Sequence, residues 1–100
     1  MKEQNNIENL DFLCRGLLCL SDMEECRRFL EDLCTQSELS EMSRRLQAAK
    51  MLRENYIYSE SAQQTGLSTA TISRVNRCLK YGDEKGYLSV LQKLERVGRR

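Results

Sequence analysis

The sequence contains no histidine, no proline and no tryptophan, and it has only five glycines among its 100 residues. Without histidine, the commonest general base of enzymes and a frequent zinc ligand are both missing. The glycines form no phosphate-cradling loop, and the carboxylates do not cluster outside ordinary helix surfaces. We therefore expect a protein that is not an enzyme and that uses no cofactor or metal ion.

Long apolar runs are also missing, and none approaches the roughly 20 residues that a helix needs to span a bilayer. The N-terminal segment, Met-Lys-Glu-Gln-Asn-Asn, lacks the basic and then apolar regions of a signal peptide. A hydrophobic content of 40% and a charged content of 31% are ordinary for a soluble globular protein. We therefore expect a cytoplasmic protein with no membrane partner, folded as a single domain over residues 1–100.

The five cysteines are Cys14, Cys19, Cys26, Cys34 and Cys78, and no two of them form a Cys-x-x-Cys pair. Their odd number and a reducing compartment argue against a disulfide framework. Cys14, Cys26 and Cys34 fall on apolar helical faces, where a free cysteine packs as a small hydrophobe. Core packing is the favoured interpretation, and a redox role is the alternative that stays open.

Charge is unevenly distributed along a chain whose formal net charge is only +1. Residues 1–50 carry seven Lys and Arg against ten Asp and Glu, whereas residues 51–100 carry nine against five. A polyanionic partner is therefore expected to bind the second half of the chain.

Apolar residues recur at the three- and four-residue spacing of amphipathic helices, which predicts an all-α fold of five to six helices. The predicted helices cover about residues 5–19, a segment after Ser21, about 35–54, about 60–65, about 69–81, and a segment around Leu88, Leu91 and Leu94. Ser21 with Glu24, and Thr35 with Glu38, each fit a capping box, in which the hydroxyl accepts from a backbone N–H while the carboxylate reaches back.

The long helix over about residues 35–54 has an apolar side and a basic side. The apolar side, expected to face the core, carries Leu39, Met42, Leu46, Ala49 and Leu52. We predict that Asn55 stops this helix, that Ser59 caps the next one, and that Ser68 caps the one after it.

The segment over about residues 58–81 has the pattern of a helix-turn-helix. An alanine allows two helices to cross closely, a glycine takes the positive φ angle of the corner, and a leucine fills that corner. Two branched residues three positions apart then hold the second helix against the first. These five positions are Ala62, Gly66, Leu67, Ile72 and Val75.

The second helix of this pair presents small and hydroxyl-bearing residues outward, together with arginines. Slim side chains let a helix enter a DNA major groove about 12 Å wide, and the helix dipole favours a phosphate at its N-terminus. Hydroxyls bond phosphates or base edges, and arginine binds guanine or phosphate through two donors. The candidate DNA-binding residues are Ser68, Thr69, Ala70, Thr71, Ser73, Arg74, Arg77 and Lys80.

Two alternatives to DNA recognition are open. In the first, the segment is simply a pair of helices, and its Ser and Thr content has no functional meaning. In the other, the helix-turn-helix is the scaffold of a helical protein-interaction or assembly module, because a fold does not fix a function. Further cations outside the pair either contact phosphates or are solvated surface charges; they are Arg53, Arg96, Arg99 and Arg100.

Two segments, "LCTQSELSEMSRRLQAAKML" and "SAQQTGLSTATISRVNRCLKYG", resemble the Trp repressor family, specifically its YerC/YecD-type branch. The likeness spans about residues 7–95. It implies an intertwined all-α homodimer with one helix-turn-helix head per subunit, acting as a DNA-binding regulator, with repression as the expected outcome. The two heads of such a dimer lie about one DNA turn, roughly 34 Å, apart on a palindromic operator.

The resemblance also implies a pocket for a small-molecule effector between the long helix and the second helix of the helix-turn-helix. Arg45, Thr71 and Arg74 match positions that line this pocket, and Thr35 matches another. The repressor that names the family has a glycine where this chain has Val75, and the effector's indole ring lies against that glycine. We therefore predict that tryptophan is not an effector of this protein.

Overall fold

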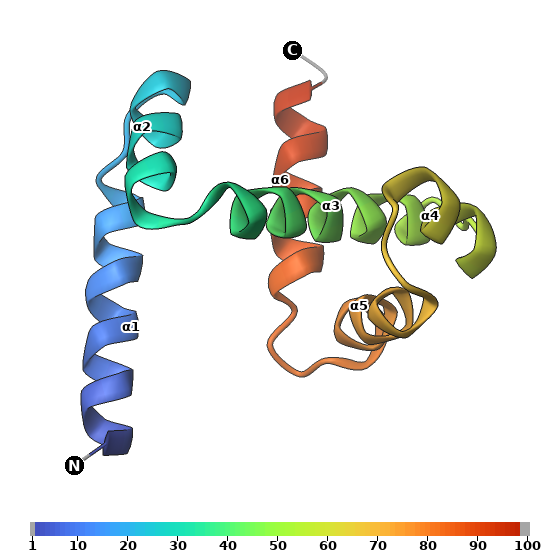
Figure 1. The fold of residues 1–100 in the computed structure, drawn as a ribbon, viewed down its shortest axis with the longest axis horizontal. Helices are drawn as coiled ribbons and strands as arrows, with labels where there is room; N and C mark the ends of the chain where they lie inside the picture. Colours follow the sequence, from blue (N-terminus) through green and yellow to red (C-terminus); the bar gives the residue numbers. More distant parts are fainter. Residues whose placement is uncertain (1, 99–100) are drawn as a thin grey trace. The chain divides into compact units, whose positions relative to one another are not determined.

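The computed structural model describes residues 2–98, and side chains from Asn6 onward. The described residues form helices and no strand, which confirms the all-α prediction (Figure 1). Arg99 and Arg100, two of the candidate phosphate contacts, lie outside the described residues. The helices are α1 (Lys2–Leu18), α2 (Met23–Leu33), α3 (Gln36–Arg53), α4 (Tyr58–Thr65), α5 (Thr69–Tyr81) and α6 (Gly86–Gly98).

The chain forms two compact units, Met1–Leu39 and Ser40–Arg100. In the first unit, Phe29 of α2 packs over Gly16 of α1, where an added Cβ would lie 3.7 Å from the ring. Many apolar side chains of this unit stay exposed, among them Ile7, Leu10 and Leu18. No helix in the described part of the chain is long and apolar enough to cross a membrane.

The cysteines are all free, and none of them belongs to the buried core. Cys26 and Cys34 are half-buried, but Cys14 is exposed, as are Cys19 and Cys78. The core-packing interpretation is therefore wrong for Cys14, because the contact of α1 with α2 within the first unit leaves this residue exposed.

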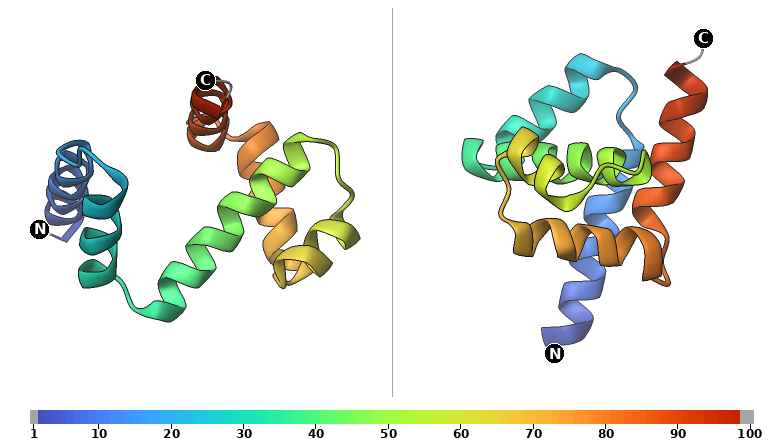
Figure 2. Two further views of the ribbon diagram at one scale, coloured as in Figure 1. Left: turned by 90° about the horizontal axis from the view of Figure 1, so that it is seen from above. Right: turned by 90° about the vertical axis from the view of Figure 1, so that its right-hand side faces the viewer.

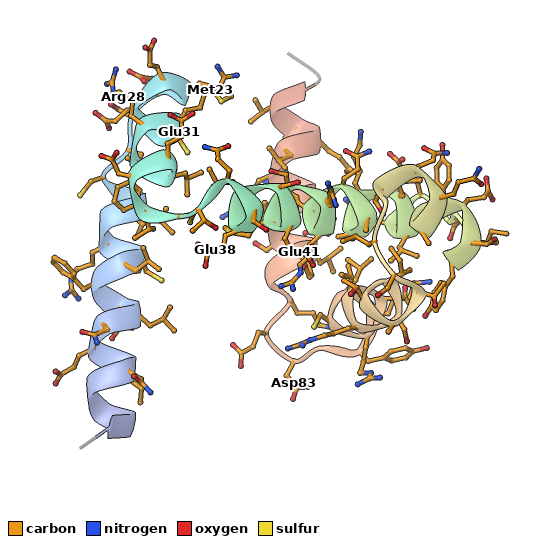
Figure 3. The ribbon with its side chains drawn as sticks, in the orientation of Figure 1. Met23, Arg28, Glu31, Glu38, Glu41 and Asp83 are labelled. Atoms are coloured by element: carbon orange, nitrogen blue, oxygen red, sulfur yellow. The ribbon has the colours of Figure 1, made fainter. Side chains whose placement is uncertain are left out.

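The start of α2 is capped one residue later than predicted. Asp22, not Ser21, is the N-cap, and its carboxylate accepts from the backbone N–H of Glu25 at 2.8 Å. The Glu25 carboxylate in turn accepts from the backbone N–H of Ser21 at 3.0 Å. Both capping roles therefore move by one position, because aspartate competes well with serine at an N-cap. On the exposed side of α2, Arg28 pairs with Glu24 at 3.5 Å. Arg28 is labelled in Figure 3.

The capping box at the start of α3 is confirmed. Thr35 Oγ1 accepts from the backbone N–H of Glu38 at 3.1 Å, and the Glu38 carboxylate accepts from the Thr35 N–H at 2.8 Å. The Thr35 backbone N–H is the main cause that lowers the pKa of Glu38 below its ordinary value, and the Thr35 side chain is the second. The bond from the Thr35 N–H to this carboxylate is therefore stronger while Glu38 is ionised.

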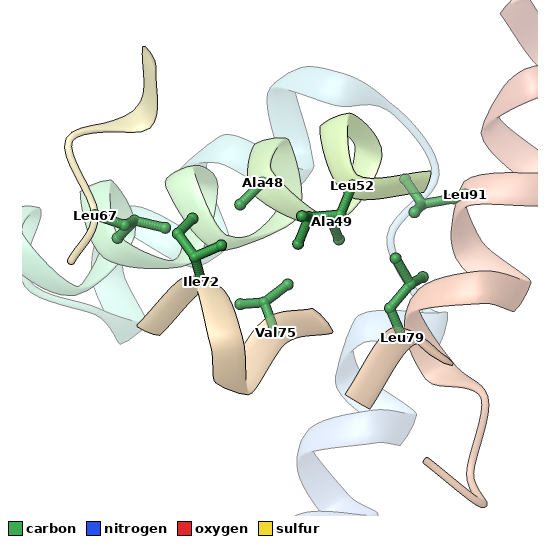
Figure 4. Packing of buried hydrophobic residues seen from close by; sticks show 8 residues of the cluster. All are labelled: Ala48, Ala49, Leu52, Leu67, Ile72, Val75, Leu79 and Leu91. Carbon is green, nitrogen blue, oxygen red and sulfur yellow. The ribbon is translucent and has the colours of Figure 1, made fainter. Parts of the chain in front are cut away.

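The core of the second unit lies where α3, α5 and α6 meet (Figure 4). The buried apolar residues of α3 begin at Ala48, and those of α5 follow its inner side. Figure 2 shows α5 crossing α3. Ala62 of α4 packs against this cluster. The cluster consists of Ala48, Ala49, Leu52, Leu67, Ile72, Val75, Leu79 and Leu91.

The predicted inner side of α3 is only partly correct. Ala49 and Leu52 are buried as predicted, but Met42 is 48% exposed and Leu46 is 37% exposed. The reason is that the buried part of α3 is its C-terminal half, where alanines let α5 approach closely. The N-terminal half of the apolar stripe, which also includes half-buried Leu39, is left largely uncovered within one chain.

The helix-turn-helix forms as predicted, with α4 and α5 joined at a left-handed glycine. Gly66 has a φ angle of 75°, and Asn55, which ends α3, has a φ angle of 71°. The Thr65 hydroxyl donates to the Ser61 carbonyl at 2.6 Å and accepts from the Leu67 N–H at 3.3 Å, which closes the corner.

The prediction that Ser59 caps α4 is wrong. The helix begins one residue earlier, at Tyr58, and its N-cap is Ile57, which makes no side-chain capping bond. The Ser61 N–H donates to the Ile57 carbonyl, so the first turn closes on backbone groups instead.

Replacing Gly66 with alanine is expected to lower the free energy of unfolding by about 1–2 kcal/mol, because a Cβ is disfavoured at positive φ. Sterics do not add to this loss, since the nearest atom to the new Cβ would be Arg44 Nη1 at 3.9 Å. Urea denaturation measures the effect. The control is Gly86→Ala, where an added Cβ meets nothing within 4 Å; equal stability losses in both variants would contradict the prediction.

Acid is expected to remove the contribution of the α3 cap to stability. Because folding lowers the pKa of Glu38, its contribution is complete above the unfolded value of 4.5 and is lost as pH falls through the folded value. The urea midpoint should therefore fall less between about pH 5 and pH 3 in Glu38→Gln than in the wild type. Glu31→Gln on α2 is the control, and a wild-type acid slope in both variants would refute the assignment.

Candidate nucleic-acid interface

The N-terminus of α5 is organised by Ser68, which caps it as predicted. Its hydroxyl oxygen accepts from the Thr71 N–H at 3.1 Å, and its hydroxyl group lies 3.0 Å from Thr71 Oγ1. These two hydroxyls are therefore engaged with each other at the helix start. The positive end of the helix dipole remains at this terminus, and no acidic residue lies in the first turn.

The outward-facing residues of α5 are those that the sequence predicts. Thr69, Ala70, Arg74, Arg77 and Lys80 are exposed, and Thr71 and Ser73 are half-buried. Beneath them, the buried side of α5 consists of Ile72, Val75, Asn76 and Leu79. The small and hydroxyl-bearing side chains of α5 therefore do not belong to the buried core of this unit.

The exposed residues of α5 fall on two sides of the helix. With 3.6 residues per turn, one side carries residues 69, 73, 77 and 80, which we call the outer edge (Thr69, Ser73, Arg77 and Lys80). The neighbouring side, about 130° further round the helix, carries Thr71, Arg74 and Cys78, which line a cavity. Of the eight candidate DNA-binding residues, Thr71 and Arg74 line this cavity and the other six do not.

Cations at this surface are free to meet an external anion. The ion pairs among the described residues are Arg28–Glu24, Arg45–Glu41 and Arg53–Glu95, so the basic side chains of α5 are not neutralised by a described carboxylate. The Arg44 guanidinium of α3 also approaches the Gly66 corner. The sequence places Arg44 on the basic side of the long helix but does not indicate this proximity.

The cavity beside α5 has a volume of about 180 Å³. Three of the four candidate effector residues, Arg45, Thr71 and Arg74, line it together. Thr35 does not line it and belongs to the first compact unit. Val75 and Tyr87 contribute to its walls, and Tyr87 packs against the core cluster. Nothing in the local sequence around Tyr87 indicates this placement, because it depends on how α6 returns toward α5.

The sequence profile of the family described as Trp repressor protein matches residues 8–95. The uncharacterized protein YerC of Bacillus subtilis (strain 168) is 51% identical over 77 residues, which cover 77% of this chain and 74% of YerC. The chain belongs to the Trp repressor family.

Solved structures agree with this assignment. The crystal structure of a TrpR-like protein from Eubacterium eligens ATCC 27750 superposes with a TM-score of 0.81 and 45% sequence identity, covering 88% of this chain and 90% of that one. A Trp repressor candidate from Staphylococcus aureus gives a TM-score of 0.81 and 43% identity, covering 88% of this chain and 87% of that one. The family is one of DNA-binding regulators.

The cavity is a poor fit for an indole-bearing effector. Its volume of about 180 Å³ is smaller than the roughly 300–1,000 Å³ of typical ligand pockets. Val75 is buried in the core and cannot move aside without unpacking Ile72 and Leu79. Of the two guanidinium groups that line the cavity, that of Arg45 already forms an ion pair with Glu41, at 3.3 Å.

Titration with tryptophan is expected to give no binding heat at sub-millimolar affinity, because Val75 and Tyr87 leave too little room for the ring. Isothermal titration calorimetry measures this directly. The control is Val75→Gly, which restores the residue that the family's namesake carries at this position. Clear saturable heat with the wild-type protein would contradict the prediction.

Proposed function

We propose that this protein is a sequence-specific DNA-binding regulator of transcription that acts as a homodimer, with repression as its effect. The observation that supports this most directly is the outer edge of α5. It combines slim hydroxyl-bearing side chains with unpaired cations, on a helix whose N-terminus carries no acidic residue. A helix of this kind enters a major groove, and its cations hold the phosphates.

The individual contacts follow from position along α5. Thr69 and Ser73 face base edges and the thymine methyl group, and Arg77 binds guanine or a phosphate. Lys80, one turn further, contacts the backbone, as do Ser68, Ala70 and Thr71 through the helix start. Arg74, on the cavity side, approaches a phosphate at the rim of the groove. Such a regulator acts where the DNA is, in the cytoplasm.

The homodimer is supported by apolar surface that a single chain does not cover. In α6, Val90 is 47% exposed and Leu94 is 51% exposed, and the apolar residues of α1 are also exposed. Exposed apolar surface of this extent is typical of an interface. A two-fold pair of heads reads a palindromic operator with half-sites about one DNA turn, roughly 34 Å, apart.

The alternative, a helical protein-interaction module, is favoured by one observation. An apolar groove of about 540 Å³ is lined by Leu46, Cys78, Tyr87 and Val90, and by the loop that precedes α6. A cheap test separates the two functions, because DNA binding weakens by about 0.9 log unit per log unit of salt for each phosphate neutralised. Retention on random duplex DNA at low salt, with release by about 0.3 M salt, supports the regulator.

Selection of binding sites from a random duplex library is expected to return a palindrome. Against that site, Arg77→Ala should weaken binding by about 1–3 kcal/mol if Arg77 contacts guanine, whereas Arg74→Ala, which removes a phosphate contact, should weaken binding to the palindrome and to a random duplex about equally. The control is Arg27→Ala, which removes the same charge from an exposed position on α2. Wild-type affinity in both α5 variants, or failure to select any site, would refute the proposal.

A further inference from the structure

The buried side of α5 contains one polar residue among apolar ones. Asn76 is 9% exposed, between the core residues Val75 and Leu79. Its side-chain Nδ2 donates to the hydroxyl oxygen of Tyr58, the first residue of α4, at 2.8 Å. This hydrogen bond therefore joins the two helices of the helix-turn-helix directly, across 18 positions of sequence.

Tyr58 is the only described residue that satisfies the buried amide of Asn76. The Asn76 Oδ1 atom is buried and has no hydrogen-bond partner among the described residues. On α4, one turn after Tyr58, Ser61 is completely buried, and its Oγ likewise has no partner there. Buried polar groups with unmade hydrogen bonds oppose folding. Maximal stability is therefore a poor explanation for these residues, whereas a defined geometry between α4 and α5 is a good one.

Asn76 also stands next to the outer edge. It precedes Arg77 and follows Ser73 by three positions, so it lies at the border between the core side and the outer edge. The contacts of Ile72 and Val75 are apolar and non-directional, which permits small rotations of α5 about its axis. A hydrogen bond weakens steeply when its angle changes, so it resists such a rotation.

We propose that Tyr58 and Asn76 are positioning residues for DNA recognition. Their hydrogen bond fixes the rotation of α5 relative to α4, and with it the direction in which the outer edge presents Thr69, Ser73 and Arg77 to the bases. The proposal rests on the function proposed above. It predicts that the bond contributes to discrimination between DNA sequences more than to binding of DNA in general.

The first test is Tyr58→Phe, measured on the selected palindrome and on a random duplex of equal length. We expect the affinity for the palindrome to fall about fivefold or more, because the buried amide loses its partner. Affinity for the random duplex should stay within about twofold, since phosphate contacts supply that binding. The matched control is Tyr56→Phe, as Tyr56 is 39% exposed and Tyr58 is 40% exposed.

The second test separates positioning from stability with a double-mutant cycle. Asn76→Leu removes the amide, and the variant with both substitutions replaces the two partners by apolar groups, which is often nearly neutral for stability. We expect its urea midpoint to recover relative to Tyr58→Phe, while its preference for the palindrome over the random duplex stays reduced. We also expect the two single losses of affinity not to multiply, since both remove one interaction.

Three outcomes would overturn the inference. The first is that Tyr58→Phe binds the palindrome within about twofold of the wild type. The second is that the two single losses of affinity multiply, which would mean that the Tyr58 hydroxyl acts independently of Asn76. Recovery of sequence preference together with stability in the double variant would mean that the bond serves folding alone. If the wild type itself selects no site, the proposed function fails as well; a selective wild type with an equally selective Tyr58→Phe refutes only the positioning role.

Discussion

The structure of the second unit depends on the close approach of α5 to the C-terminal half of α3. This approach is possible because Ala48 and Ala49 present almost no side chain, so Ile72 and Val75 fill the space against the helix backbone. With the inner side of α5 held in this way, its outer edge is turned to solvent. The core and the candidate interface are two sides of one helix, and neither can be repacked independently.

Contacts at the corner extend this constraint to α4. At Gly66 the chain turns from α4 into α5, and Leu67 is buried at this turn. The Thr65 hydroxyl bonds to the Ser61 carbonyl on one side of the turn and to the Leu67 N–H on the other. Apolar packing sets the distance between α4 and α5, and the Tyr58–Asn76 hydrogen bond adds a direction. On our proposal, these contacts together hold the outer edge of α5 in one orientation for DNA recognition.

The sequence predicts those features that depend on short-range patterns. The corner at Gly66, the caps at Thr35 and Ser68 and the inner residues of α5 follow from fixed local spacings, and they are confirmed. The errors arise where two candidates compete locally, as at the α2 cap, or where burial depends on distant neighbours. Met42 and Leu46 continue the apolar stripe of α3, but no element of one chain covers them fully. Tyr58, Asn76 and Tyr87 were missed because their partners lie on other helices. The assignment of α5 residues to DNA contacts, and the single domain over residues 1–100, stay predictions.

Val75 affects both the packing of the core and the size of the cavity. Its side chain packs the core and at the same time forms a wall of the cavity beside Arg74. A change to glycine would enlarge the cavity but would remove buried apolar contacts and add backbone freedom to the unfolded chain. Room for a ring-shaped ligand beside α5 and a tightly packed head therefore compete for the same side chain.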